Sequence, residues 1–227
     1  MIPIKSESEI KIMRTACRIA ATVLDDLCQL VAPGVNTYDL DQAGRKLLAK
    51  YEAQSACFGY QVGSKRFPAH TCLSVNDEIV HGIGTLKRVL REGDLVSVDV
   101  CVEYRGYIGD NARTVPVGEI SPEKQKLLNV TEASLMAAID QARPGNRVGA
   151  ISNTVERIIR PHGFGIIRDF VGHGVGRTMH EAPQIPNFGP RNRGEKLRAG
   201  MTLAIEPMIS LGRPKVRMGD DGWTALT

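Results

Sequence analysis

The feature that most constrains the fold of this 227-residue chain is an internal repeat. Shifting the sequence by 111 residues aligns Pro33-Gly34 with Pro144-Gly145, and the apolar positions of the segments that follow them also align. A shift of 107 residues aligns residues 93–99 with 200–206, two apolar runs that each end in a carboxylate. Because a helical pattern, a Pro-Gly turn and a second helical pattern occur twice, the repeat indicates two related halves.

The spacing of apolar residues predicts the elements of each half. It indicates a helix over residues 6–31, a second from Thr37, and a third from Pro122 to the Pro-Gly turn at 144–145. Alternating apolar residues over 95–117 predict a β-hairpin. We therefore expect one α+β domain, with helices covering one face of a mostly antiparallel sheet. We expect this single domain to span residues 1–227, with pseudo-twofold related halves of about 1–118 and 119–227.

The predicted hairpin carries Asp99 on one arm and Asp110 on the other. A loop at Tyr104-Arg105 pairs the two aspartates directly, and a loop at Arg105-Gly106 leaves them diagonal on the same face. A three-residue loop separates them. Two carboxylates at cross-strand distance repel each other unless a cation or a shared proton lies between them. The hairpin therefore indicates a cation site, and the alternative is that one aspartate faces solvent.

Two further groups extend the candidate site. His173 lies in the run Gly172 to Gly176, where residues without a Cβ let the backbone fold tightly around the imidazole. Glu206 follows an apolar strand-like run, where an unpaired charge is costly to bury. Two aspartates, one glutamate and one histidine suit Mn, Fe, Co or Zn in a hydrolytic two-metal centre. The glycine-rich run could instead be a phosphate cradle, but no nucleotide-binding motif accompanies it.

Composition and charge exclude several classes of protein. No apolar run approaches the roughly 18 residues that a membrane span needs, and the charged N-terminus does not fit a secretory signal. Five scattered cysteines indicate reduced thiols, each most simply a small buried side chain, in a cytoplasmic protein. The net charge of +4 is dense only over residues 191–198, where no aromatic residues interleave. We expect neither DNA nor a membrane as a partner, and a monomer.

Six motifs stand in an order and spacing typical of one enzyme family: 76–82, Val98-Asp99, Gly109-Asp110, 172–177, His180-Glu181-Ala182-Pro183 and Glu206-Pro207. Over nearly the whole chain the sequence resembles the type I methionine aminopeptidases. The short stretch between His180 and Glu206 leaves no room for the insertion that marks type II enzymes. This resemblance implies the pita-bread fold and the removal of N-terminal methionine from nascent proteins by a metal-dependent hydrolase.

The resemblance also implies roles for individual residues. It assigns Asp99 to one divalent ion, Asp110 to a bridge between two, and His173 with Glu206 to the other, with Co, Mn, Fe or Zn as the metal. His81 and His180 contact the substrate around the scissile amide, and Glu206 is the candidate general base. The residues that match the methionine pocket are Cys57, Tyr60, Phe67, Cys72, Met179 and Trp223. A transient association with the ribosome is compatible with substrates of this kind.

One departure concerns the C-terminal end. The family has a second metal-bridging glutamate on a strand shortly after the stretch that Asp221 to Thr224 match, and this sequence stops at Thr227. We expect the C-terminal strands and that ligand to be missing. The departure keeps an alternative open, a non-catalytic binding protein on the same fold with a residual metal site. Retention of the four other metal-binding positions argues for the enzyme.

Overall fold

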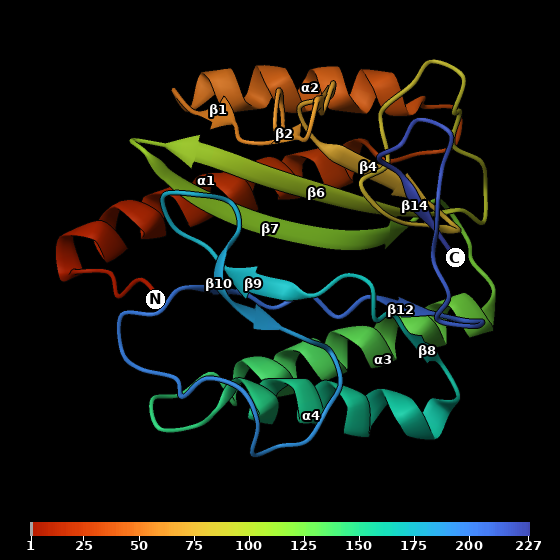
Figure 1. The fold of residues 1–227 in the computed structure, drawn as a ribbon. Coiled ribbons are helices and arrows are strands. Elements are labelled where there is room, and N and C mark those ends of the chain that lie inside the picture. Colours follow the sequence, from red (N-terminus) through yellow and green to blue (C-terminus); the bar gives the residue numbers. More distant parts are fainter. Residues whose placement is uncertain (1) are drawn as a thin grey trace. The chain divides into compact units, whose positions relative to one another are not determined.

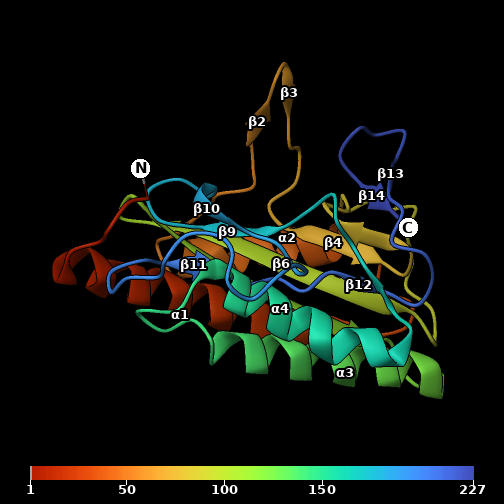
Figure 2. The same ribbon diagram turned by 60° about the horizontal axis from the view of Figure 1, so that its bottom comes forward.

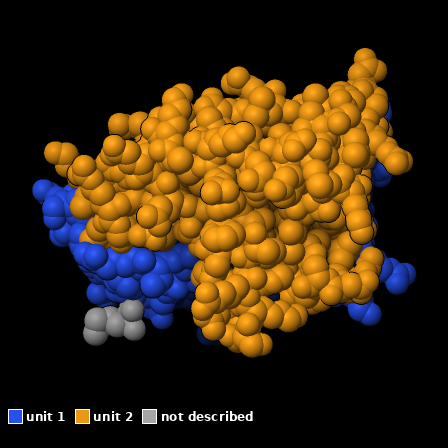
Figure 3. Space-filling model, turned by 90° about the horizontal axis from the view of Figure 1, so that it is seen from above, with its two compact units in different colours: residues 1–10, 122–216, 227 blue, residues 11–121, 217–226 orange. Residues whose placement is uncertain are grey.

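The computed structural model describes residues 2–227, which form two compact units. Unit 1 comprises the chain up to Ile10, Pro122–Val216 and Thr227, and unit 2 comprises Lys11–Ser121 and Arg217–Leu226 (Figure 3). The boundary at Ser121 lies close to the point where the sequence repeat divides. The segment Arg217–Leu226 nevertheless belongs to the unit that is formed mainly by the first half.

Unit 2 contains most of α1 and the sheet that carries the aspartates (Figure 1). Its elements are α1 (Glu7–Leu30), α2 (Thr37–Lys50), β1 (Gln54–Ser55), β2 (Gln61–Val62), β3 (Lys65–Arg66), β4 (Cys72–Val75), β5 (Glu78–Val80), β6 (Leu95–Tyr104), β7 (Tyr107–Pro116), β13 (Arg217–Met218) and β14 (Ala225–Leu226). Strand β6 pairs with β1, β4 and β7, and β14 pairs with β5 and β13. The β2–β3 hairpin stands away from the β6 sheet (Figure 2).

The two faces of β6 differ in a way that positions the site. Val96, Val98 and Val100 are fully buried in a core that also contains α1 residues such as Leu24 and Leu27. Because side chains alternate along a strand, the residues between these valines project from the opposite face of the sheet. Asp99 and Cys101 belong to that second set. The helices therefore cover one face, as the sequence predicts, and the candidate donors occupy the other.

The β6–β7 hairpin settles the register that the sequence left open. The two strands pair antiparallel from Leu95 opposite Pro116 to Tyr104 opposite Tyr107. The loop is Arg105-Gly106, and both residues have positive φ, +50° and +77°, as type I′ turns require. Cys101 is therefore opposite Asp110. Of the three loops that the sequence left open, the structure has the one at Arg105-Gly106, which leaves Asp99 and Asp110 diagonal on the same face.

Unit 1 repeats the helix, Pro-Gly turn, helix order. Its elements are α3 (Pro122–Ile139), α4 (Val148–Ile159), the 3₁₀ turn η1 (Arg160–His162), β8 (Gly165–Ile166), β9 (Gly172–Gly174), β10 (Glu181–Ile185), β11 (Leu203–Ala204) and β12 (Ile209–Ser210). Strand β9 lies between β10 and β11, and β12 pairs with β8. The core joins Ile151, Val155 and Ile159 of α4 to Ile185 and Leu197. Every strand pair among the described residues is antiparallel.

Two element boundaries differ from the sequence prediction. Helix α3 ends at Ile139 rather than at the Pro-Gly turn, and residues 140–147 connect it to α4 without regular structure beyond turns. Strand β11 ends at Ala204, whereas the apolar run that predicts it continues to Ile205, directly before Glu206. Within residues 2–227, no helix is both long and apolar enough to cross a membrane.

Candidate metal centre and substrate pocket

The β6–β7 hairpin brings three potential metal donors together in unit 2. A carboxylate oxygen of Asp99, the thiol of Cys101 and a carboxylate oxygen of Asp110 all lie within 4.8 Å of one another. Asp99 and Cys101 are two residues apart on β6, and Asp110 is opposite Cys101 on β7. Their side chains share a face because strand residues alternate with a period of two. The predicted proximity of the two aspartates is therefore observed, with a cysteine beside them that the prediction did not include.

Unit 1 supplies a second pair, His173 and Glu206. Strand β9 holds the imidazole, whose Nε2 is 3.2 Å from Oε1 of Glu206. The other ring nitrogen, Nδ1, lies 2.8 Å from the carbonyl oxygen of Gly174. A carbonyl only accepts hydrogen bonds, so Nδ1 carries the proton, and in a neutral ring Nε2 then presents a lone pair to the carboxylate. Two acceptors at this distance need a proton or a metal ion between them.

The state of Glu206 supports a cation at this position. Its Oε1 is a buried oxygen that makes no hydrogen bond in the described part of the chain, although Nε2 of His173 lies close by. A buried carboxylate oxygen without a partner is costly. A histidine that donates one ring N–H to a backbone carbonyl and turns the other nitrogen towards a carboxylate has the arrangement typical of a metal ligand. The residues present therefore fit a divalent metal.

A cavity of about 450 Å³ opens beside His173 in unit 1. Its lining residues are Val171, His173, His180, Glu181, Ala182 and Gln184. The rings of His173 and His180 have centroids 4.4 Å apart and meet nearly edge-on. The volume lies within the range of roughly 300–1,000 Å³ that small-molecule sites occupy. His180 is exposed and His173 is buried, so the cavity presents one accessible imidazole next to the candidate ligand.

Glu181 fixes the turn that leads to His180. Its Oε2 accepts a bond from Nζ of Lys5 at 2.5 Å, and its Oε1 accepts the N–H groups of Arg177 at 2.9 Å and Thr178 at 3.3 Å. Lys5 comes from the N-terminal segment of the same unit, and its own N–H bonds to the carbonyl of Gly200. Both side chains of the ion pair are at least nine-tenths buried. Neither residue was among the sequence candidates for a functional role.

Most of the predicted methionine-pocket residues lie in unit 2, and contacts link them. The Phe67 ring meets the Trp223 ring edge-on with centroids 5.3 Å apart. The N–H of Tyr60 bonds to the carbonyl of Cys57, and the N–H of Phe67 bonds to that of Tyr60. Cys57, Phe67 and Cys72 are buried. Met179 and His180 lie in unit 1, in the turn before β10.

His81 follows β5 directly and is held in an unusual backbone conformation. Its φ is +61°, in the left-handed region that residues other than glycine rarely adopt. Its carbonyl lies 3.4 Å from the hydroxyl of Thr224. Such strain is common at functional sites. This backbone conformation is compatible with the substrate role that the sequence predicts for His81.

Three thiols meet at the same place in unit 2. The Cys57 thiol hydrogen-bonds with those of Cys101 and Cys72, and these bonds lower the pKa of Cys57 against the effect of burial. The hydrogen bond to Cys57, burial, and the charges of Asp110 and Asp99 raise the pKa of Cys101. The expectation of a buried cysteine holds at these three positions. It is wrong for Cys17, which is exposed.

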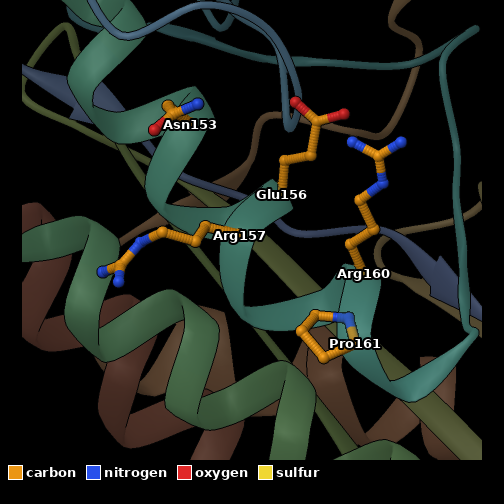
Figure 4. Close-up of a pocket in the computed structure, with 5 residues that line it drawn as sticks. All are labelled: Asn153, Glu156, Arg157, Arg160 and Pro161. Carbon is orange, nitrogen blue, oxygen red and sulfur yellow. The ribbon is translucent and has the colours of Figure 1, made fainter.

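A second cavity, of about 350 Å³, lies along α4 (Figure 4) and is lined by Asn153, Glu156, Arg157, Arg160 and Pro161. Two of its polar groups already have structural roles. Asn153 donates to the carbonyl of Gly189, and Glu156 accepts the N–H of the same glycine at 2.9 Å. These bonds tie the loop around Gly189 to the helix, so both residues have a structural role.

The sequence profile of metallopeptidase family M24 matches residues 11–224, and the chain belongs to this family. Among curated proteins, it is 44% identical over 227 residues to a methionine aminopeptidase of Clostridium acetobutylicum, covering 89% of that protein. It is 43% identical to methionine aminopeptidase 1 of Bacillus subtilis, of which it covers 90%. The resemblance to type I methionine aminopeptidases is thereby confirmed.

Comparison with solved structures supports the same family assignment. The crystal structure of a methionine aminopeptidase from Thermotoga maritima superposes with a TM-score of 0.96 at 43% identity, covering all of this chain and 90% of that one. The prolidase from Pyrococcus horikoshii matches 90% of this chain and 55% of its own, with a TM-score of 0.75 at 26% identity. The predicted α+β pita-bread fold is confirmed by these likenesses.

Proposed function

We propose that the chain is a metal-dependent aminopeptidase that removes the N-terminal methionine from newly made polypeptides. Two relatives with about 43–44% identity over the full length carry the name methionine aminopeptidase. The observation that carries the proposal is the pairing of His173 Nε2 with Glu206 Oε1, two acceptors 3.2 Å apart that a metal ion would reconcile. The alternative, a non-catalytic binding protein with a residual metal site, would account for that arrangement but not for the similarity to named aminopeptidases.

The proposed metal ligands are Asp99 and Asp110 in unit 2 and His173 and Glu206 in unit 1. Their oxygen and nitrogen donors suit Co, Mn, Fe or Zn, with up to two ions in each chain. A bound divalent ion supplies Lewis-acid activation of a carbonyl and brings the pKa of a water to about 7. The ions would also be the counter-charge for the carboxylates on the β6–β7 face.

The chain's own residues then provide the proton transfers. Glu206 takes the proton of the attacking water as general base. His180 donates a hydrogen bond to the oxyanion that forms on the scissile carbonyl, because it is the accessible imidazole of the cavity beside His173. His81 hydrogen-bonds the substrate near the scissile amide.

Side-chain selection is proposed to come from Cys57, Tyr60, Phe67, Cys72, Met179 and Trp223. A pocket of thiols and aromatic rings accepts an unbranched apolar chain and offers no partner to a charged one. Such a pocket separates homologous side chains by only about 1–3 kcal/mol per methylene. Norleucyl peptides should therefore be accepted beside methionyl peptides.

The proposed setting of the reaction is the cytoplasm, where nascent chains emerge and thiols stay reduced. The partners would be the N-terminal methionyl segments of those chains, met by a monomeric enzyme during transient contact with the ribosome.

The test is hydrolysis of a Met-Ala-Ser peptide by chain that a chelator has stripped of metal, before and after addition of Co(II), Mn(II), Fe(II) or Zn(II). Activity that appears with metal and is lost again with chelator supports the proposal. A Glu-Ala-Ser peptide is the control for pocket selectivity. A chain that binds metal but cleaves no methionyl peptide under any of these conditions would favour the non-catalytic alternative.

A further inference from the structure

Cys101 is placed where a metal ligand would be placed. Its thiol points from the same face of β6 as Asp99 and is opposite Asp110 on β7. The thiol lies 3.6 Å from Oδ1 of Asp99. Only about 4% of the residue is exposed, so this sulfur is directed into the sheet's donor cluster and away from solvent. A side chain chosen only to fill space at this position would not need a metal-binding atom.

The spacing of the donors fits one ion. Ligand atoms at roughly 2.0–2.3 Å from a transition metal lie at most about 4.6 Å from one another. The Asp99 oxygen, the Cys101 sulfur and the Asp110 oxygen are all within 4.8 Å of each other. Shifts of a few tenths of an ångström would let all three approach one ion. The hairpin register holds the three donors in this triangle, because each is fixed by a strand rather than by a loop.

We infer that Cys101 is a third protein ligand of the metal ion held by Asp99 and Asp110, so that this ion is bound by two carboxylates and one thiolate. The inference rests on the proposed metallopeptidase function and refines it. On binding, the thiol proton is released to solvent and the sulfur forms the metal bond as thiolate.

A thiolate at this position changes which metal the chain prefers. Sulfur ligands favour Zn, Co and Fe over Mn and Mg, whereas a purely carboxylate set favours the harder ions. The chain should therefore discriminate against Mn(II) more strongly than an oxygen-only site would. The sulfur also makes the site sensitive to thiol oxidation, because a ligand thiolate is the form that oxidants attack.

The competing explanation is that Cys101 is a structural thiol. It hydrogen-bonds with Cys57 and with Asp99 in the absence of metal, and those bonds could be its whole role. The two explanations differ in what happens when metal binds. A ligand thiol loses its proton and forms a metal–sulfur bond, whereas a structural thiol keeps both its proton and its hydrogen bonds.

The experiment is a Co(II) titration of metal-free chain under anaerobic conditions, followed by absorption spectroscopy and calorimetry. Bound Co(II) should give a near-ultraviolet thiolate-to-cobalt charge-transfer band in the wild type and in two cysteine controls. These controls are Cys28→Ser, at a thiol that lies beside Asp25 and Arg113, and Cys57→Ser, which removes the neighbouring thiol. The band should be absent from Cys101→Ser.

Calorimetry adds a readout that does not depend on spectra. Cys101→Ser should weaken Co(II) binding by roughly 10–100-fold, the loss expected when support for a metal is removed, and weaken Mn(II) binding much less. Cys101→Asp, which restores an anionic ligand, should recover affinity without recovering the band. If Cys101→Ser folds poorly, Cys101→Asp still tests whether the absorption band requires the sulfur of Cys101.

Three results would overturn the inference. A wild-type chain that binds Co(II) without a thiolate band shows that no sulfur is a ligand, and a band lost only in Cys57→Ser assigns the ligand to another cysteine. In both cases the proposed aminopeptidase function stands if methionyl peptides are cleaved. Failure of the wild type to bind Co(II) at all rejects both this inference and the metal-dependent function.

Discussion

The β6–β7 hairpin and the β9–β11 sheet present their candidate ligands in opposite ways. In the hairpin, ten residues of each strand pair without interruption, and the pleat alone decides that Asp99 and Cys101 face the same side. Strand β9 has three residues, two of them glycine, and its partner β10 pairs with a register shift. His173 is therefore oriented by close backbone contacts and by individual hydrogen bonds instead of by a long ladder.

The comparison predicts how substitutions in each region affect stability and chemistry. A hairpin of this length tolerates a changed side chain, because backbone pairing continues on both sides of it, so substitutions there should alter chemistry more than stability. The short strands depend on particular side chains and on missing Cβ atoms, so substitutions there should alter stability and chemistry together. The five predictions that follow test this division, from the largest expected effect to the smallest.

Asp110→Asn should abolish turnover while the chain stays folded. The amide has nearly the shape of the carboxylate but cannot supply the negative charge that the proposed metal site needs. Peptide hydrolysis and thermal unfolding of the variant give the two readouts. Glu103→Gln makes the same chemical change on an exposed position of β6 and should leave activity intact. Asp110→Asn activity within about tenfold of wild type, ~1.4 kcal/mol of barrier, would contradict the assignment.

His180→Ala should lower kcat by roughly 10²–10³-fold, as expected for loss of an oxyanion donor, with metal content unchanged. The side chain is exposed beside the cavity, so its removal should cost little stability. The measurements are steady-state kinetics and metal analysis of the purified variant. His162→Ala, at an exposed histidine of η1, is the matched control. If the His180 variant lost its metal, the residue would be a ligand instead.

Lys5→Met should destabilise the chain by up to about 3–5 kcal/mol, the range for removing one partner of a buried ion pair. The two backbone N–H groups that remain on Glu181 should reduce that cost. Urea unfolding measures it, with the exposed Lys215→Met as control. The double variant Lys5→Met with Glu181→Gln should recover part of the loss, because no unpaired charge stays buried. Equal stability of single and double variants would show that the ion pair is not the cause.

The difference between the β6–β7 hairpin and the β9–β11 sheet also explains which features could be predicted from the sequence. Periodicity predicted the order of helix, Pro-Gly turn and helix. It also predicted which face of β6 is apolar, because regular elements repeat their pattern over many residues. The hairpin register was narrowed to three alternatives, and the positive φ of Arg105 and Gly106 selects among them. The alternative that pairs residue 101 with Asp110 already contained the signal for Cys101, since it puts that thiol beside both carboxylates.

The interactions of unit 1 were beyond the reach of the sequence for a physical reason. Lys5 and Glu181 are 176 positions apart, and their ion pair follows no periodic pattern. The end of β11 before Glu206 likewise depends on how β9 packs against its partners rather than on the local apolar run. The glycines around His173 signalled close packing, but they did not identify the segments that make the contact.

Gly174→Ala should cost about 1–3 kcal/mol of stability, the usual penalty of overpacking. A Cβ at this position would clash with the backbone of Ala182 on β10, and backbone cannot move aside as a flexible side chain can. The matched control is Gly212→Ala in the same unit, where a Cβ would meet no atom of the described chain within 4 Å and φ is not positive. The free energies of unfolding of the two variants, measured in urea, should differ clearly. Equal values would mean that close packing is not the reason for glycine in β9.

The smallest effect is expected at the hairpin turn, and it should be stabilising. Arg105 has a φ of +50°, a left-handed conformation that costs most residues roughly 1 kcal/mol and that asparagine adopts more easily. Arg105→Asn should therefore raise the free energy of unfolding by about 0.5–1 kcal/mol. The arginine also lies over the Tyr104 ring, 5.2 Å from its centroid, and the substitution loses that contact.

Arg105→Gln separates the two effects, because it removes the same charge and the same ring contact but keeps a side chain that disfavours positive φ. The stability difference between the asparagine and glutamine variants then reports the turn conformation alone. Neither variant should change peptide hydrolysis, since ten paired residues on each strand hold Asp99 and Asp110 in register whatever occupies the loop. A loss of activity in both variants would show that the turn, and not the ladder, determines where the carboxylates lie, which would remove the distinction between the hairpin and the β9–β11 sheet.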